Sequence, residues 1–216
     1  MKKAYIATSR VTNIMTKSKL QSWEGRKQLF KSIVVATLLY ASEIYSLRYL
    51  KSLERVQTAF YKRVFNWQFC TPGYVVRSET GSEPICTIAL KRALQYLKKL
   101  QCMEENCWPK LCCNKLIELD ATNPSMIKYN WVSQLKSVLH TTGQTLELSN
   151  HLTTPLINSL VNKYTTTLIA TDRERIQKST FCPMHHLLVD CSSYIGENIN
   201  FNKIKVISQL RVCGNF

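Results

Sequence analysis

Apolar residues recur at steps of three and four positions along most of this chain, which is the spacing of one face of an α-helix. The pattern predicts a first helix over residues 1–19. A second helix is expected to begin after Ser22, a favourable N-cap residue, and to run toward Leu47. Its predicted core face consists of Leu29, Ile33, Ala36, Tyr40 and Ile44.

The third predicted helix, over about residues 47–66, has an apolar side and a basic side. Glu54 is the one carboxylate on this helix that could neutralise the basic side, so most of its charge lacks an acidic neighbour. This arrangement favours contact with phosphate groups over a salt-bridged solvent face. The predicted core positions are Leu53, Val56, Phe60 and Val64, and the opposing cations are Arg48, Lys51, Arg55 and Lys62.

Further helices are expected after a loop over residues 66–84, which turns at Pro72-Gly73. The helix from Pro84 to about Met103 adds Lys91, Lys98 and Lys99 to the candidate phosphate contacts. The remaining predicted elements are helices over 125–140 and 155–177 and a short helix or strand over 203–213. We therefore expect an all-α fold, with a basic helical bundle over residues 1–115 and a less regular helical segment over 116–216.

Positive charge is concentrated in the first half of the chain. The whole sequence has 29 Lys and Arg against 14 Asp and Glu, a net charge of +15. Residues 1–115 contain 20 basic and 7 acidic residues, whereas residues 116–216 contain 9 and 7. A basic half next to a nearly neutral half is typical of a protein with a face that binds a polyanion such as RNA or DNA.

No catalytic residue is predicted. Polymerases need paired carboxylates to hold two metal ions, and this chain has no Asp-Asp pair; its aspartates are Asp120, Asp172 and Asp190. The adjacent Glu104 and Glu105 are more typical of a solvated helix end. We expect no cofactor in this chain.

Two groups of cysteine and histidine residues are weighed as zinc sites. Structural zinc sites usually place two to four residues between paired ligands. The spacing from Cys102 to Cys113 is at the edge of this range, whereas Cys182 and His185 are acceptably spaced but belong to a group with two adjacent histidines, which rarely both bind one ion. No metal ligand is therefore assigned, and buried or reactive thiols are the alternative. The groups are Cys102, Cys107, Cys112 and Cys113, and Cys182, His185, His186 and Cys191.

Aromatic residues near positive charge can stack on unpaired bases. Trp23, Trp67, Phe69 and Tyr74 lie in or beside basic segments, and most are expected in the core. Trp67 and Tyr74, which fall in the predicted loop, are the candidates for nucleic-acid contact. The start of the chain is too polar for a secretory signal, and no apolar run approaches the ~20 residues of a membrane span, so an intracellular location, nuclear or cytoplasmic, is expected without a membrane partner.

Residues from about Trp23 to Leu100 resemble the region that follows the polymerase palm in reverse transcriptases of non-LTR retrotransposons of the LINE-like, jockey type. The shared order of several short blocks carries the resemblance. They are Leu29 with Leu39-Tyr40-Ala41-Ser42-Glu43-Ile44, then Leu53-Glu54-Arg55-Val56-Gln57 with Phe60, and then Glu79-x-Gly81-x-x-Pro84. A further fragment near the end of the chain, Ile207-Ser208-Gln209-Leu210-Arg211, resembles the Leu-Arg element that these proteins carry shortly before a C-terminal zinc knuckle.

The resemblance implies a helical thumb, within the predicted domain over residues 1–115, that grips RNA and DNA as an RNA–DNA duplex or as single strands. It also implies a palm, absent from this chain, as a packing partner, and polymerase activity is not implied for this chain alone. The alternative is a degenerate element-derived helical protein with a scaffold role or no function.

Overall fold

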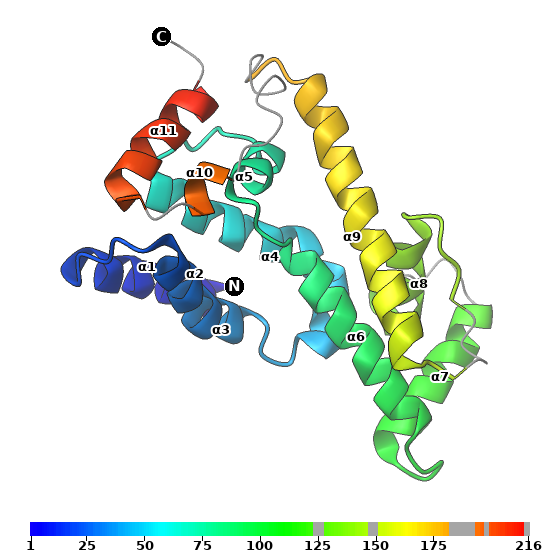
Figure 1. Cartoon of the computed structure of the whole chain (residues 1–216). Helices are drawn as coiled ribbons and strands as arrows, with labels where there is room; N and C mark the ends of the chain where they lie inside the picture. The colour runs from blue at the N-terminus through cyan, green and yellow to red at the C-terminus, as the bar shows by residue number, and fades with distance from the viewer. Residues whose placement is uncertain (123–127, 147–150, 182–192, 197–198, 214–216) are drawn as a thin grey trace. The chain divides into compact units, whose positions relative to one another are not determined.

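The computed structural model confirms the all-α fold, because every regular element among the described residues is a helix (Figure 1). The structure describes residues 1–122, 128–146, 151–181, 193–196 and 199–213. The elements are α1 (Lys2–Lys17), α2 (Trp23–Leu29), the π-helix η1 (Phe30–Val35), α3 (Ala36–Leu38), α4 (Ser42–Phe65), α5 (Gly73–Thr80), α6 (Ile85–Gln101), α7 (Trp108–Thr122), α8 (Trp131–His140), α9 (Thr154–Gln177), α10 (Ser193–Gly196) and α11 (Phe201–Cys213).

The helices form two compact units, each assembled from segments that are separated in the sequence. Helices α4 and α9 contribute residues to both units. The predicted division after residue 115 does not coincide with the units, because that residue lies within α7, inside unit 2. Unit 1 consists of Met1–Tyr40, Ser52–Pro84 and Ile169–Phe216, and unit 2 consists of Ala41–Lys51 and Ile85–Leu168.

Aromatic rings dominate the core of unit 1. The rings of Phe30 and Phe60 stack with centroids 4.2 Å apart, and Trp23 lies 5.0 Å from Phe65. Phe201 of α11 lies 6.3 Å from Trp23 and joins this group. The α4 positions that were predicted to be buried are confirmed as core: Leu53, Val56, Phe60 and Val64.

The second predicted helix is interrupted before it reaches Leu47. Helix α2 passes into the π-helix η1 and then into the short α3. The chain turns at Ala41, whose φ of +51° lies in the left-handed region that terminates a helix. Helix α4 then begins at Ser42 and absorbs the last residues of the segment.

The buried face of this segment also differs from the predicted one. Phe30, Val34 and Leu38 are buried, whereas two predicted core residues, Tyr40 and Ile44, are 81% and 60% exposed. Apolar residues lie on more than one side of this run, so helical period alone did not identify the buried side. The π-helix hydrogen-bonds from i to i+5 and changes the angular position of the side chains that follow it.

Part of the segment predicted as a loop forms the helix α5. It ends at Gly81, whose φ of +57° suits a residue without a Cβ. The carboxylate of Glu79 is fully buried next to this end. Arg211 Nε donates a hydrogen bond to Glu79 Oε1 over 2.8 Å, and Tyr194 donates another to the same oxygen. These contacts connect α5 to α10 and α11 within unit 1.

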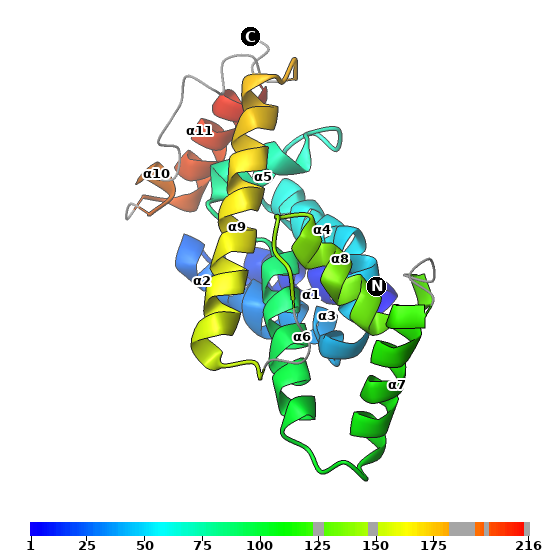
Figure 2. The ribbon, with the colours of Figure 1, turned by 90° about the vertical axis from the view of Figure 1, so that its right-hand side faces the viewer.

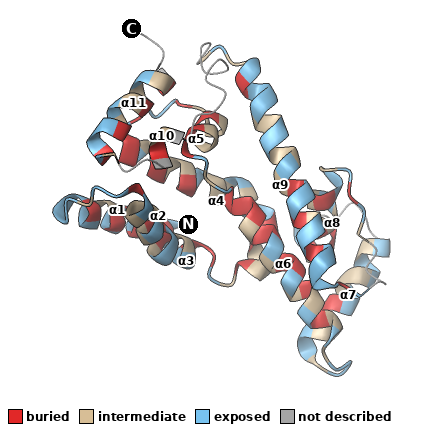
Figure 3. Cartoon of the chain, in the orientation of Figure 1, coloured by how far each residue is buried: buried red, intermediate tan, exposed pale blue. Residues whose placement is uncertain are grey.

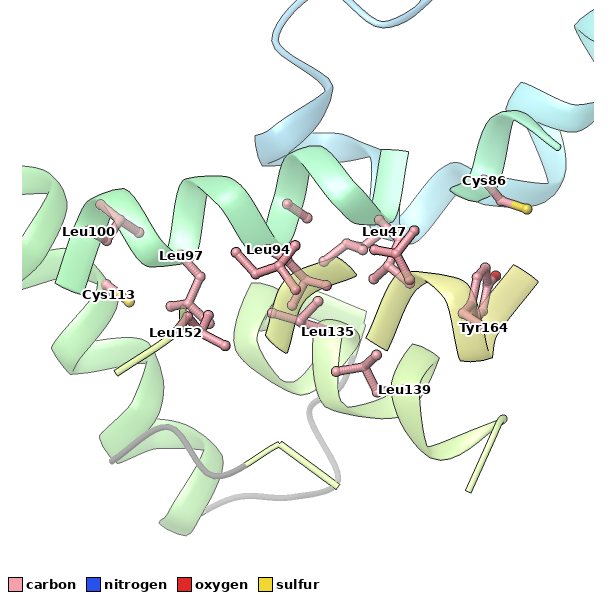
Figure 4. Packing of buried hydrophobic residues seen from close by; sticks show 14 residues of the cluster. Leu47, Cys86, Leu94, Leu97, Leu100, Cys113, Leu135, Leu139, Leu152 and Tyr164 are labelled. Atoms are coloured by element: carbon pink, nitrogen blue, oxygen red, sulfur yellow. The ribbon is translucent and has the colours of Figure 1, made fainter. Parts of the chain in front are cut away.

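Leucine side chains build the core of unit 2, where α6, α7, α8 and the first part of α9 are neighbours (Figures 1 and 2). Leu94 and Leu97 of α6 pack with Leu135 and Leu139 of α8 (Figure 4). The inner face of α6 is accordingly buried, whereas α9 is exposed along much of its length (Figure 3). Helices α4 and α9 complete the cluster with Leu47, Ile157, Val161 and Tyr164.

Asp120 provides a polar link between α7 and α8. Its Oδ2 lies 2.6 Å from Lys136 Nζ, and Ser133 donates a hydrogen bond to Oδ1. Burial raises the pKa of Asp120. The hydrogen bonds from Lys136 and Ser133 and the charge of Lys136 lower it by more than burial raises it, so this pKa lies below its ordinary value. The ionised carboxylate therefore stabilises the fold above the unfolded-state pKa of about 3.9, and this contribution is lost as the pH falls through the folded-state pKa.

Replacing Lys136 with methionine is expected to lower the free energy of unfolding by about 1 kcal/mol at neutral pH, because a mostly buried carboxylate loses its cation. The difference from the wild type should shrink as the pH falls below about 4. Urea titrations across this pH range measure it. Lys115→Met is the control, since Lys115 pairs with Glu118 and both side chains are 62% exposed. A pH-independent difference for Lys136→Met would contradict the assignment.

Candidate nucleic-acid interface

The seven predicted phosphate contacts divide between the two units. Arg55 and Lys62 belong to unit 1. Unit 2 contains Arg48, Lys51, Lys91, Lys98 and Lys99. The candidate interface therefore has two parts, one in each unit.

Arg55 is exposed on α4 and has no carboxylate partner among the described residues. Its neighbour Glu54 faces a different side chain, because Glu54 Oε2 lies 3.5 Å from Arg77 Nη1. Arg77 also forms a bidentate contact with Asp172, with both N–O distances at 2.7 Å. The carboxylate that the sequence suggested as a neutralising partner is thus engaged with Arg77, and Arg55 presents its charge to solvent.

Lys62 differs from Arg55, because its side chain is partly buried and held by the following loop. Lys62 Nζ donates a hydrogen bond to the carbonyl oxygen of Phe69 over 2.8 Å and lies 5.5 Å from the centroid of the Phe69 ring. Burial lowers the pKa of Lys62, and the nearby Cys70 thiol partly offsets this effect. Lys62 therefore organises the end of α4 as well as contributing positive charge.

Arg48 and Lys51 are exposed on the part of α4 that belongs to unit 2. The predicted arc of cations assumed an uninterrupted helix, but Tyr49 has φ −117° and ψ 19°, which breaks the helical geometry between them. The Arg48 guanidinium lies 5.4 Å from the ring of Tyr49 and 5.6 Å from that of Tyr129. Arg48 consequently precedes the kink and does not continue the regular stripe of the later α4 cations.

Helix α6 presents a basic outer face. Its 17 residues include four cations and no aspartate or glutamate. Lys91 and Lys99 are exposed, and Lys98 Nζ donates a hydrogen bond to Thr154 Oγ1 over 2.8 Å. Lys98 and Lys99 lie in the last turn, where cations also interact favourably with the helix dipole. The opposite face is the leucine core, so the outer face is directed to solvent by packing.

The two aromatic candidates for nucleic-acid contact are not freely exposed. Trp67 is buried and stacks on Phe65 with centroids 4.7 Å apart, and the Tyr74 hydroxyl lies 2.9 Å from Ser179 Oγ. The exposed ring in this region is Phe69, at 92%. Sequence periodicity did not single it out, because the loop between α4 and α5 has no repeat that distinguishes an inward ring from an outward one.

Arg63 is a further exposed cation that the predicted stripe did not include. It follows Lys62 on α4, and its Nη1 donates a hydrogen bond to Ser9 Oγ of α1 over 3.0 Å. The helical angle of Arg63 excluded it from the predicted arc. Only the packing of α1 against this end of α4 shows where its guanidinium lies.

The residues weighed for catalysis and zinc binding do not form a centre within the described part of the chain. No group of three or more His, Cys, Asp or Glu side chains there is arranged to hold a metal ion. Asp120 and Asp172 lie in different units, each with a cationic partner. Cys102 and Cys112 are exposed, whereas Cys113 is buried. The second candidate zinc group, with Asp190, lies outside the described residues.

Among the described residues, no single helix is long and apolar enough to cross a bilayer, although the bent pair Trp23–Leu38 and Ser42–Phe65 has the required length and composition when the two are combined. Neither models of known protein families nor curated proteins nor solved structures match this chain. The likeness to retrotransposon reverse transcriptases thus rests on the short sequence blocks described above and stays a prediction.

Proposed function

We propose that this chain grips nucleic acid, in the manner of the thumb and post-palm region of a non-LTR retrotransposon reverse transcriptase, and that it holds no polymerase active site of its own. The ligand is an RNA–DNA duplex or a related template–primer. The cations neutralise backbone phosphates and do not read bases, so binding is expected to be independent of sequence.

The outer face of α6 is the observation that supports this proposal most strongly. A solvent-facing helix usually mixes both charge signs, which allows salt bridges between successive turns. Helix α6 instead has four cations and no acid. Arg48 and Lys51 add exposed charge to the same unit, and neither has a carboxylate partner among its described residues. Such an excess of cations over acidic residues is suited to a polyanion.

The proposal predicts that wild-type protein binds a labelled RNA–DNA duplex of about two helical turns with an affinity that falls steeply with salt. Each phosphate neutralised releases counterions, so log K should fall linearly with log salt concentration, with a slope of about −0.9 per contact on B-form duplex. Fluorescence anisotropy between about 50 and 200 mM salt measures the slope. An absence of binding at the lowest salt concentration, or an affinity unaffected by salt, would contradict the proposal.

A further inference from the structure

Unit 1 contains a hollow of about 450 Å³ between α1 and the end of α4. A volume of this order suits a ligand of nucleotide size. Polar residues of α1, one of them aromatic, line one side, residues of α4 line the other, and the loop after α4 closes the end. The lining residues are Tyr5, Thr8, Ser9, Ala59, Lys62, Arg63, Asn66, Trp67 and Phe69.

The lining residues that the structure describes combine positive charge with aromatic rings, and none of them has a carboxylate. Arg63 is anchored by one nitrogen to Ser9, which leaves other N–H groups of its guanidinium to bind an anion. Its side chain has no carboxylate partner among the described residues. A planar guanidinium with free donors is suited to the oxygens of a phosphate.

Phe69 is held in its exposed position by Lys62. The hydrogen bond from Lys62 Nζ to the Phe69 carbonyl oxygen fixes the backbone, and the ammonium group lies 5.5 Å from the ring centroid. Phe69 is nevertheless 92% exposed, so a large apolar side chain is displayed beside the cations. Tyr5 of α1, at 44% exposed, adds a second ring to the same hollow.

We infer that this hollow takes an unpaired nucleotide of a single strand, with its base stacked on Phe69 and its phosphate on Arg63. The inference rests on the proposed function, since it assigns a substrate class to the end of α4. Lys62 acts as a positioning residue for the Phe69 loop.

The class of ligand follows from the exposed ring. In a duplex the faces of the bases are covered by their neighbours, so a protein ring cannot stack on them without unstacking a step. In a single strand each base offers an open face, and aromatic rings beside a cationic groove are the usual way to bind it. The basic face of α6 can bind any strand through its phosphates alone, whereas binding in this hollow requires an unpaired base.

The test compares a single strand of about 16 nucleotides with a duplex of the same sequence, titrated against the full chain. Phe69→Ala should weaken single-strand binding by about 5-fold or more and change duplex binding by less than about 2-fold. Phe69→Trp keeps an aromatic face and should restore single-strand affinity. Tyr40→Ala is the matched control, because Tyr40 is 81% exposed in unit 1 and does not line the hollow.

The outcomes separate this inference from the proposed function. Equal effects of Phe69→Ala on both ligands, or no effect on either, would overturn the single-strand site while salt-dependent duplex binding left the proposed function intact. Failure of the wild type to bind either ligand would overturn both. AMP is then added as a competitor at a concentration equal to that of the nucleotides in the strand. If AMP displaces the strand equally well, and Phe69→Ala weakens AMP binding to the same degree, the site binds free nucleotides and the assignment to a strand is also overturned.

Discussion

Replacing Glu79 with alanine is expected to lower the free energy of unfolding by about 3–5 kcal/mol, because the change leaves the mostly buried Arg211 without its carboxylate. Glu79 is fully buried, and the Arg211 side chain is 19% exposed. The same carboxylate accepts a hydrogen bond from Tyr194, so its removal also takes away the contact between α5 and α10. Urea unfolding followed by circular dichroism measures the loss.

A double substitution distinguishes the ion pair from simple packing. Arg211→Met alone should also be strongly destabilising, because it leaves a buried carboxylate without its cation. Glu79→Leu combined with Arg211→Met should recover much of the loss, since replacing a buried pair with apolar residues is often close to neutral. A cost below about 1 kcal/mol for either single change would show that solvent reaches the pair and that it does not hold α5 to α11.

Removing the exposed cations of the proposed interface is expected to weaken duplex binding by about 100-fold or more near 100 mM salt, because five phosphate contacts would be lost. The variant changes five residues to glutamine, and all five side chains are exposed without a carboxylate partner among the described residues. Anisotropy titration of the labelled duplex measures the change. The substituted residues are Arg48, Lys51, Arg55, Lys91 and Lys99.

A matched variant controls for net charge. It also replaces five exposed cations with glutamine and so lowers the formal charge by the same amount, but at positions outside the proposed interface. We expect this control to bind within a few-fold of the wild type. A control as weak as the interface variant would show that the total charge matters and the assigned residues do not. The control residues are Lys3, Lys17, Lys31, Lys163 and Lys203.

Helical period predicted the all-α fold and the buried face of the later part of α4, because Leu53, Val56, Phe60 and Val64 recur on one side of that helix. In the segment before α4, helical period did not identify the buried side. Phe30, Val34 and Leu38 lie on one side and Ile33 on another, so either side could have been the core. The π-helix and the turn at Ala41 determine which side is buried, and the hydrophobic pattern indicates neither of them.

The candidate site was predictable where charge alone decided it. The sequence shows that α6 has no acidic residue, and packing then directs Lys91 and Lys99 to solvent. Contacts between distant segments were not predictable in the same way. The engagement of Glu54 by Arg77 and the hydrogen bond from Arg63 to Ser9 depend on how the helices pack, as does the exposure of Phe69.

The salt dependence of duplex binding by the wild type, the interface variant and the matched control is the most direct measurement of the central claim. If the five cations contact phosphates, the slope of log K against log salt concentration should be shallower in the interface variant by about 4–5. The slope of the control should equal that of the wild type. Equal slopes for the wild type and the interface variant would contradict the assignment of these cations to the nucleic-acid backbone.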